Sequence, residues 1–190
     1  MAQLRTRFRL ERVVVVGDRG TLTHTHIDSL TQSPGLGWIA ALRCEAIRQL
    51  ADTHTLDVAL VAQERLAEIT SVPCPGERLV ACATPLVAQQ RQRQRHAWLE
   101  ATAHDWAAMV REVARRTTTP WGQAEIGKKV GQVLHHYPMA KHFTVQIEDK
   151  QLSYARRSES IQREAALDGI YVIRTSEPAE RLSAEDTMRG

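Results

Sequence analysis

The sequence predicts an α/β protein whose central sheet is interrupted by an inserted subdomain. Two apolar runs, 13–16 and 170–173, lack polar alternation, which is typical of strands buried on both faces of a sheet. Between them lies a mixed segment with a long helix over about 85–117, a stretch without glycine or internal proline. We therefore expect a partial core sheet and a mixed α+β insertion.

Short elements are predicted in the first half of the chain. Thr23 or Thr25 can cap a short helix that carries Ile27 and Leu30, and the turn residues of "QSPGLG" end it. The remaining patterns predict the last turns of a helix over 2–8, strands over 38–42, 56–61 and 78–82, a helix over 44–51, and a turn at 73–77.

Longer elements are predicted in the second half. In the helix over 85–117, apolar residues recur at spacings of seven, four and three, at Leu99, Trp106, Val110 and Val113. A second helix carries Ile126 and Val130. A β-hairpin turns at "EDKQ", because apolar and polar residues alternate on both sides of it, and Ser158 or Ser160 can cap a helix over 161–167.

The charge distribution permits a nucleic-acid partner. The net charge is only +3 and the pI about 9.0, but the basic residues are clustered, a pattern that a phosphate backbone would exploit. The alternative is a solvated amphipathic helix whose arginines only keep it soluble. The residues predicted to contact nucleic acid are Arg91, Arg93, Arg95, Arg111, Arg115, Arg116, Lys128 and Lys129.

Several classes of protein are excluded by what the sequence lacks. The three cysteines have no C-x-x-C spacing, and His24 and His26 are poorly spaced for a metal pair, so neither a disulfide framework nor a zinc site is predicted. No apolar stretch is long enough for a membrane span or signal peptide, so we expect a cytoplasmic protein without a membrane partner. Nucleophile-elbow, Walker and dinucleotide-binding motifs are absent.

Asp18 is the residue with the clearest catalytic potential. It follows the apolar run 13–16, and the carboxyl ends of strands in open α/β sheets carry ligands and chemistry. A carboxylate there can bind Mg²⁺ if other acids join it, although aspartate beside glycine is also common in turns. Asp168 is predicted to form a turn on the wrong edge of a parallel sheet, and Glu185 and Asp186 to start a helix capped by Ser183.

Five segments of the chain resemble a known family. They are "RVVVVGDRGTLT", "GLGWIAALRCEAIRQL", "PGERLVACATPLVAQQRQRQR", "YPMAKHF" and "ALDGIYVIRTSEPAERLSAEDT". Together they resemble bacterial insertion-sequence transposases of the DDE class, in the group with a long insertion between the second Asp and the Glu. Thr21 stands where the family commonly has Met.

The resemblance implies a fold and a function. It implies an RNase H-like catalytic core over 1–30 and 158–190, an insertion over 31–157, and a role for Asp18 as the second catalytic, metal-binding aspartate. The complete enzyme would use Mg²⁺ or Mn²⁺ to cleave and transfer DNA at insertion-sequence ends. The first aspartate would precede Met1 and the glutamate would follow Gly190, so we expect this chain to be inactive alone and not to hold the metal tightly.

Two other functions are open at this stage. The chain could be a non-catalytic remnant that competes for DNA or joins transposase protomers through its long helix. Asp18 could alternatively accept a phosphoryl group or serve an Mg²⁺-dependent phosphatase. This last function needs a second nearby acid and a lysine at a later strand end, and neither is found in the sequence.

Overall fold

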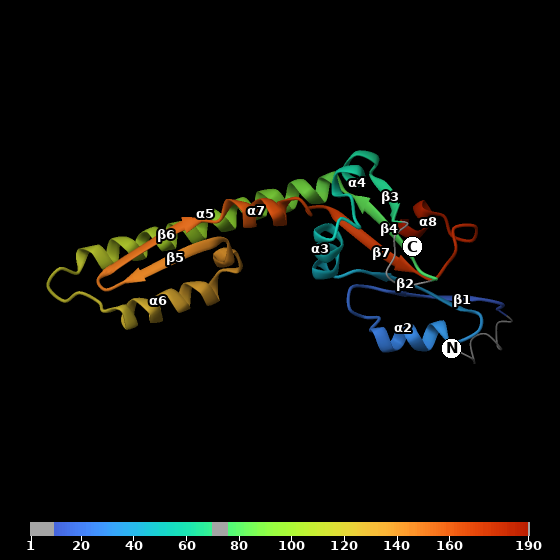
Figure 1. Ribbon diagram of the computed structural model, residues 1–190, viewed down its shortest axis with the longest axis horizontal. Coiled ribbons are helices and arrows are strands. Elements are labelled where there is room, and N and C mark those ends of the chain that lie inside the picture. The colour runs from blue at the N-terminus through green and yellow to red at the C-terminus, as the bar shows by residue number, and fades with distance from the viewer. Residues whose placement is uncertain (1–9, 70–75, 190) are drawn as a thin grey trace. The chain divides into compact units, whose positions relative to one another are not determined.

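The computed structural model describes residues 10–69 and 76–189, which fold as two compact units (Figure 1). Unit 1 consists of Met1–Pro85 and Gly169–Gly190, and unit 2 of Leu86–Asp168. The helix predicted over 2–8 and most of the turn at 73–77 lie outside the described residues.

Unit 1 is built on a five-stranded mixed sheet in the order β1-β2-β7-β4-β3. Only β1 and β2 are parallel, and the other neighbouring strands are antiparallel. The mixed α/β class is therefore confirmed. The strands are β1 (Val13–Gly17), β2 (Leu36–Ala41), β3 (Leu66–Ile69), β4 (Arg78–Ala83) and β7 (Ile170–Thr175).

The prediction that the first apolar run is buried on both faces is wrong. Strand β1 is at one end of the strand order, and exposed residues alternate with more buried ones along it. Val14 and Val16 are 37% and 59% exposed, whereas Val15 pairs in register with the fully buried Trp38. A run of valines satisfies the backbone preference of any strand, so it does not reveal how many faces are covered.

Helix α2 (His24–Thr31) packs on the face of β2 that carries Trp38 and Ala40, with Ile27 buried against both. Of the two predicted caps, Thr23 and Thr25, the structure has Thr23, which accepts a hydrogen bond from the N–H of His26. The unit also contains α3 (Cys44–Asp52), α4 (Val58–Glu64) and α8 (Ala184–Arg189).

The strand predicted over 56–61 is instead helix α4. The Asp57 carboxylate accepts a hydrogen bond from the N–H of Leu60 at 3.0 Å, which caps the helix, and Arg65 ends it with a φ of 64°. Leu56 and Val61 are both buried. A short apolar run cannot be assigned to a strand or a helix by periodicity alone. Here the Asp57 cap favours the helix.

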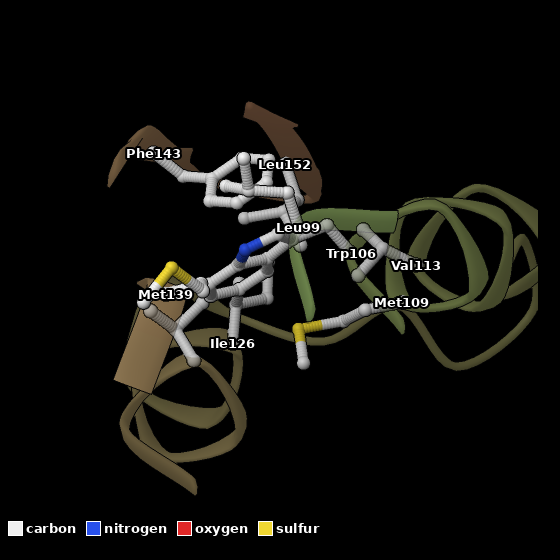
Figure 2. Close-up of a cluster of buried hydrophobic side chains, with 9 residues drawn as sticks. Leu99, Trp106, Met109, Val113, Ile126, Met139, Phe143 and Leu152 are labelled. Carbon is white, nitrogen blue, oxygen red and sulfur yellow. The ribbon is translucent and has the colours of Figure 1, made fainter. Parts of the chain in front are cut away.

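Unit 2 follows the predicted pattern of a long helix, a second helix and a hairpin. Its core centres on Trp106, which is fully buried among apolar side chains from both helices and both strands (Figure 2). The elements are α5 (Pro85–Arg115), α6 (Gln123–His136), the 3₁₀ helix η1 (Pro138–His142), β5 (Phe143–Glu148), β6 (Gln151–Arg156) and α7 (Ser158–Ala165).

The boundaries of the predicted insertion differ from those of the structural units. Residues 31–85, predicted to be inserted, provide β2, β3 and β4 of the unit 1 sheet. Residues 158–168, predicted to return to the core, belong to unit 2. Strand β4 belongs to this sheet because it pairs with β7 along its whole length. Among the described residues, no helix is both long enough and apolar enough to cross a membrane.

Candidate functional site

Asp18 is exposed in a tight turn at the carboxyl end of β1. The turn is closed by a 2.9 Å hydrogen bond from the N–H of Thr21 to the carbonyl oxygen of Asp18, and Gly20 at its third position has a φ of 84°. That left-handed conformation favours glycine, which explains the second glycine of the motif. Asp18 Oδ1 accepts a 2.6 Å hydrogen bond from the N–H of Arg19, so the backbone holds one oxygen of this exposed carboxylate at the strand end.

The described residues do not complete a metal site around Asp18. No group of three histidine, cysteine or acidic side chains suited to a metal ion occurs in residues 10–69 and 76–189. One carboxylate is too few for Mg²⁺ held by protein oxygens in a two-metal arrangement. The described residues therefore do not by themselves fit a resident Mg²⁺ or Mn²⁺.

Asp168 was predicted to lie at the wrong edge of a parallel sheet. That prediction is wrong, because β7 is antiparallel to β2. The start of β7 therefore lies at the same end of the sheet as the carboxyl ends of β1 and β2. Asp168 is nevertheless occupied: its carboxylate is paired with the Arg95 guanidinium inside unit 2. Asp186 lies in the first turn of α8, where its N–H donates to Ser183 Oγ at 3.1 Å, which confirms the predicted cap.

A cavity of about 310 Å³ opens beside the Asp18 turn. It is lined by Gly20 of the turn, Thr23 at the start of α2, Ala40 of β2, and the arginines Arg43 and Arg174. Its lining includes no acid, so the cavity suits an anion such as a phosphate better than a metal ion. Arg43 has no ion-pair partner among the described residues, whereas Arg174 is paired with Glu77.

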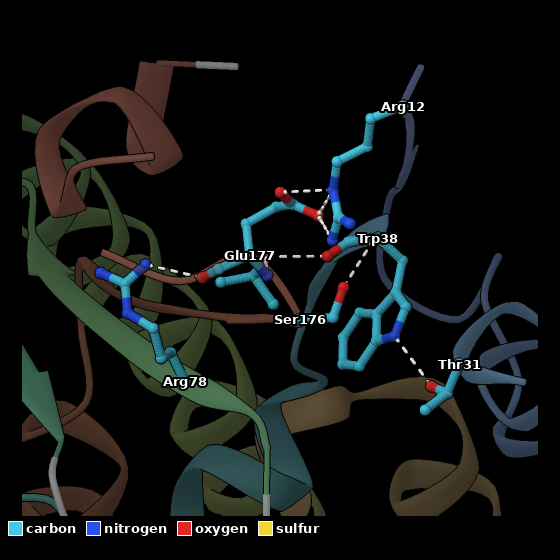
Figure 3. Close-up of polar contacts among 7 residues, drawn as sticks. Arg12, Thr31, Trp38, Arg78, Ser176 and Glu177 are labelled. Carbon is cyan, nitrogen blue, oxygen red and sulfur yellow. Dashed lines mark hydrogen bonds and ion pairs between the residues drawn. The ribbon is translucent and has the colours of Figure 1, made fainter. Parts of the chain in front are cut away.

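The opposite end of the sheet is held by a buried carboxylate that the sequence did not single out (Figure 3). Glu177 follows β7 and is 3% exposed, and its carboxylate accepts hydrogen bonds from Arg12, which precedes β1. Its backbone carbonyl accepts a 2.8 Å hydrogen bond from Arg78. This end of the sheet is structural, because every charged group named here is engaged with another part of unit 1.

The basic residues predicted to contact nucleic acid differ in exposure. Arg95 is buried, with 7% of its surface exposed, and its guanidinium pairs with Asp168, so it does not fit a role in binding phosphate. Arg91 is partly buried and takes part in an interaction. The exposed members are Arg93, Arg111, Arg115, Lys128 and Lys129.

Two of these basic residues, Arg116 and Lys129, lie against a tryptophan that the sequence did not single out. Trp121 lies in the connection between α5 and α6, and the Arg116 guanidinium carbon is 4.1 Å from its ring centroid. The Lys129 ammonium is 5.6 Å from the same centroid. We use the name Trp121 cluster for these contacts together with the exposed basic residues next to them along α5 and α6; its members are Arg111, Arg115, Arg116, Trp121, Lys128 and Lys129. These cation-π contacts form between residues on either side of the connection between two helices, so the spacing of residues in the sequence could not predict them.

A Ser–His–Glu contact also occurs in unit 2. His142 Nδ1 is 2.8 Å from Ser160 Oγ, and its Nε2 is 3.3 Å from Glu164 Oε2 without hydrogen-bond geometry. Burial lowers the pKa of His142, although the negative charge of Glu164 opposes this effect. Because His142 is 1% exposed, a substrate could not reach it, and the contact is a buried polar network of the core.

The chain was compared with models of known families, curated protein sequences and solved structures, and none of them matches it.

Proposed function

We propose that the chain is part of a DDE transposase and contributes Asp18 to its catalytic site. The observation that carries this proposal is the position of Asp18: an exposed carboxylate at the carboxyl end of a strand that runs parallel to its neighbour. The anion-compatible cavity beside it, lined by Arg43, adds support, because DNA is a polyanion.

The role of this chain in the reaction is to position one acid. The β1 strand and the turn closed by Thr21 fix the Asp18 carboxylate at the sheet end, and the N–H of Arg19 orients one of its oxygens. A divalent metal would be held only where two further acids join Asp18 in a complete protein. Asp18 would then supply an oxygen ligand, the chemistry that carboxylates provide to such ions.

A complementation assay tests this proposal. The chain is combined with transposase core segments that carry the first aspartate and the final glutamate, and nicking of plasmid DNA is measured with Mg²⁺. We expect Asp18→Asn to lower the rate by at least about a hundredfold, because a metal ligand is lost. Asp28→Asn, at an exposed aspartate of α2, is the matched control and should leave the rate unchanged. Activity that persists in Asp18→Ala would refute the proposal.

A second candidate function is non-catalytic binding of DNA. The observation that favours it is the Trp121 cluster, where Arg116 and Lys129 lie over one indole ring and Arg111, Arg115 and Lys128 are exposed on α5 and α6. Such a surface suits phosphates of a nucleic-acid backbone without reading base sequence.

Its test is the salt dependence of binding to a fluorescein-labelled DNA duplex, followed by anisotropy. If three to five cations meet phosphates, the logarithm of the association constant should fall with the logarithm of salt concentration with a slope of about −3 to −5. Replacing Arg115 and Lys128 by alanine should reduce the slope by about 2. Arg163→Ala, at an exposed arginine of α7, is the control for loss of one charge elsewhere in unit 2. Absence of salt-dependent binding would exclude this candidate.

A further inference from the structure

The ring of Trp121 is fixed on one side by the core of unit 2. It packs, partly buried, against the cluster that includes Trp106 and Ile126. A side chain held in this way cannot turn freely, so a group that rests on it is held as well. The indole is therefore a rigid platform at the junction of α5 and α6.

Two cations from different segments of unit 2 lie over this ring. Arg116 follows the last residue of α5, and Lys129 belongs to α6, and both lie within cation-π distance of the ring at 4.1 and 5.6 Å. The N–H groups of a guanidinium point outward in its own plane. A guanidinium that stacks on a ring can therefore still donate hydrogen bonds to an acceptor beside the ring.

The hydrogen bonding of Arg116 is incomplete in the described part of the chain. Its Nη2 donates to Glu112 at 3.3 Å, but its Nε is buried with no hydrogen-bond partner there. Arg111 and Arg115 are exposed one helical turn apart on α5, and Lys128 is exposed next to Lys129 on α6, so the same two helices carry further positive charge. Among residues 10–69 and 76–189, Glu112 is the only acid in an ion pair with a member of this group.

We infer that Trp121 is a positioning residue: its ring holds Arg116 and Lys129 as a preformed pair of cations for adjacent phosphates of a nucleic-acid backbone. This inference rests on the candidate function of DNA binding. It adds that the Trp121 ring holds the Arg116 and Lys129 side chains in place before DNA binds. Long flexible cations lose conformational entropy when they bind, and holding them beforehand reduces that loss.

The test measures binding of the full chain to a fluorescein-labelled DNA duplex by anisotropy. Trp121→Ala should weaken binding about three- to tenfold, from the loss of two cation-π contacts, and Trp121→Phe should restore most of it. Trp98→Ala is the matched control: Trp98 is a 43% exposed tryptophan of α5 with no cation-π contact among the described residues. It should change binding by less than about twofold.

A double-variant comparison separates positioning from stability. In a chain that already carries Arg116→Ala and Lys129→Ala, Trp121→Ala should have no further effect on binding. If Trp121 served only to hold the fold, its effect would persist in that background and would not be rescued by phenylalanine, and the inference would be wrong.

The outcomes also distinguish this inference from the function on which it rests. If Arg115→Ala and Lys128→Ala weaken binding but Trp121→Ala does not, positioning by Trp121 is excluded and DNA binding stands. If the unaltered chain does not bind the duplex, both are excluded.

Discussion

Arg12 and Glu177 form a forked ion pair across 165 positions of sequence, with Arg12 Nε 3.0 Å from each carboxylate oxygen and Nη2 2.6 Å from Oε1. Glu177 is nearly fully buried, while the Arg12 side chain is 32% exposed. The hydrogen bonds from this pair raise the pKa of Arg12 above its ordinary value. The pair therefore joins the segment before β1 to the segment after β7.

Arg12→Ala should destabilise unit 1, because it leaves a buried carboxylate without its partner. We expect the free energy of unfolding to fall by about 2–4 kcal/mol, measured by urea denaturation followed by circular dichroism. Arg48→Ala removes a partly exposed arginine whose partner, Glu45, is exposed, and should cost less than about 0.5 kcal/mol. Equal losses in the two variants would show that the pair with Glu177 is not a special constraint.

Arg95→Ala should act on stability rather than on DNA binding alone. Arg95 and Asp168 have side chains only 8% and 11% exposed, so removal of one partner should cost about 3–5 kcal/mol in thermal or urea unfolding. Arg93, two residues away and exposed, is the matched control. Arg93→Ala should leave the melting temperature unchanged; if Arg95→Ala did the same, Arg95 would be free to serve as a surface cation.

The stability of unit 2 should fall as the solution becomes acidic, in two separate ranges. Burial lowers the pKa of His142, and nearby Lys141 and Arg95 lower it further. His142 is therefore protonated more readily in the unfolded chain than in folded unit 2. The free energy of unfolding should decline as pH falls below about 6.5, by up to about 1.4 kcal/mol per pH unit. Urea unfolding at a series of pH values measures this slope.

Replacement of His142 tests the assignment of the upper range. His142→Asn should abolish the slope just below pH 6.5, while His135→Asn, at an exposed histidine, should retain it. Although burial alone would raise the pKa of Glu164, the hydrogen bond and charge of Lys141 and the charges of His142 and Arg95 hold it below its ordinary value. The Glu164 contribution should be lost only at more acidic pH, so the lower range should remain in His142→Asn.

Glu112→Gln should tighten DNA binding if the Trp121 cluster is the binding surface. The Glu112 carboxylate accepts a hydrogen bond from Arg116, and its neutralisation frees that guanidinium for a phosphate. We expect affinity to rise about two- to fivefold in an anisotropy assay at low salt. Glu100→Gln makes the same change in net charge at a residue paired with Arg156 at 2.9 Å, outside the cluster. Equal gains in both variants would indicate an effect of overall charge.

The sequence predicts elements with local signals more accurately than it predicts their surroundings. The hairpin and the helices at 44–51 and 85–117 follow from periodicity and turn residues, and they appear with small shifts at their ends. The exposure of Val14 and Val16 could not be predicted, because it depends on the place of β1 in the order of the sheet.

For the candidate functional residues too, local features could be predicted from the sequence, whereas contacts with distant residues could not. The turn at Asp18 follows from local chemistry, since a left-handed conformation favours Gly20. Arg93 and Arg95 are equivalent in a charge pattern, yet only Arg95 meets an acid 73 positions later. Trp121 could have been suspected from an aromatic residue between two basic segments, but its contact with Lys129 depends on how α6 packs beside α5.

The order of the strands has a consequence for synthesis on the ribosome. Strand β7 lies between β2 and β4, so the parallel pair β1–β2 and the hairpin β3–β4 cannot join until β7 has been made. All of unit 2 is translated in that interval, which takes roughly 5–15 s at ordinary elongation rates. During this time unit 2 can fold, because it is a continuous stretch of chain. The two parts of the unit 1 sheet still have unpaired strand edges, and this is the stage at which we expect chaperones to be most needed.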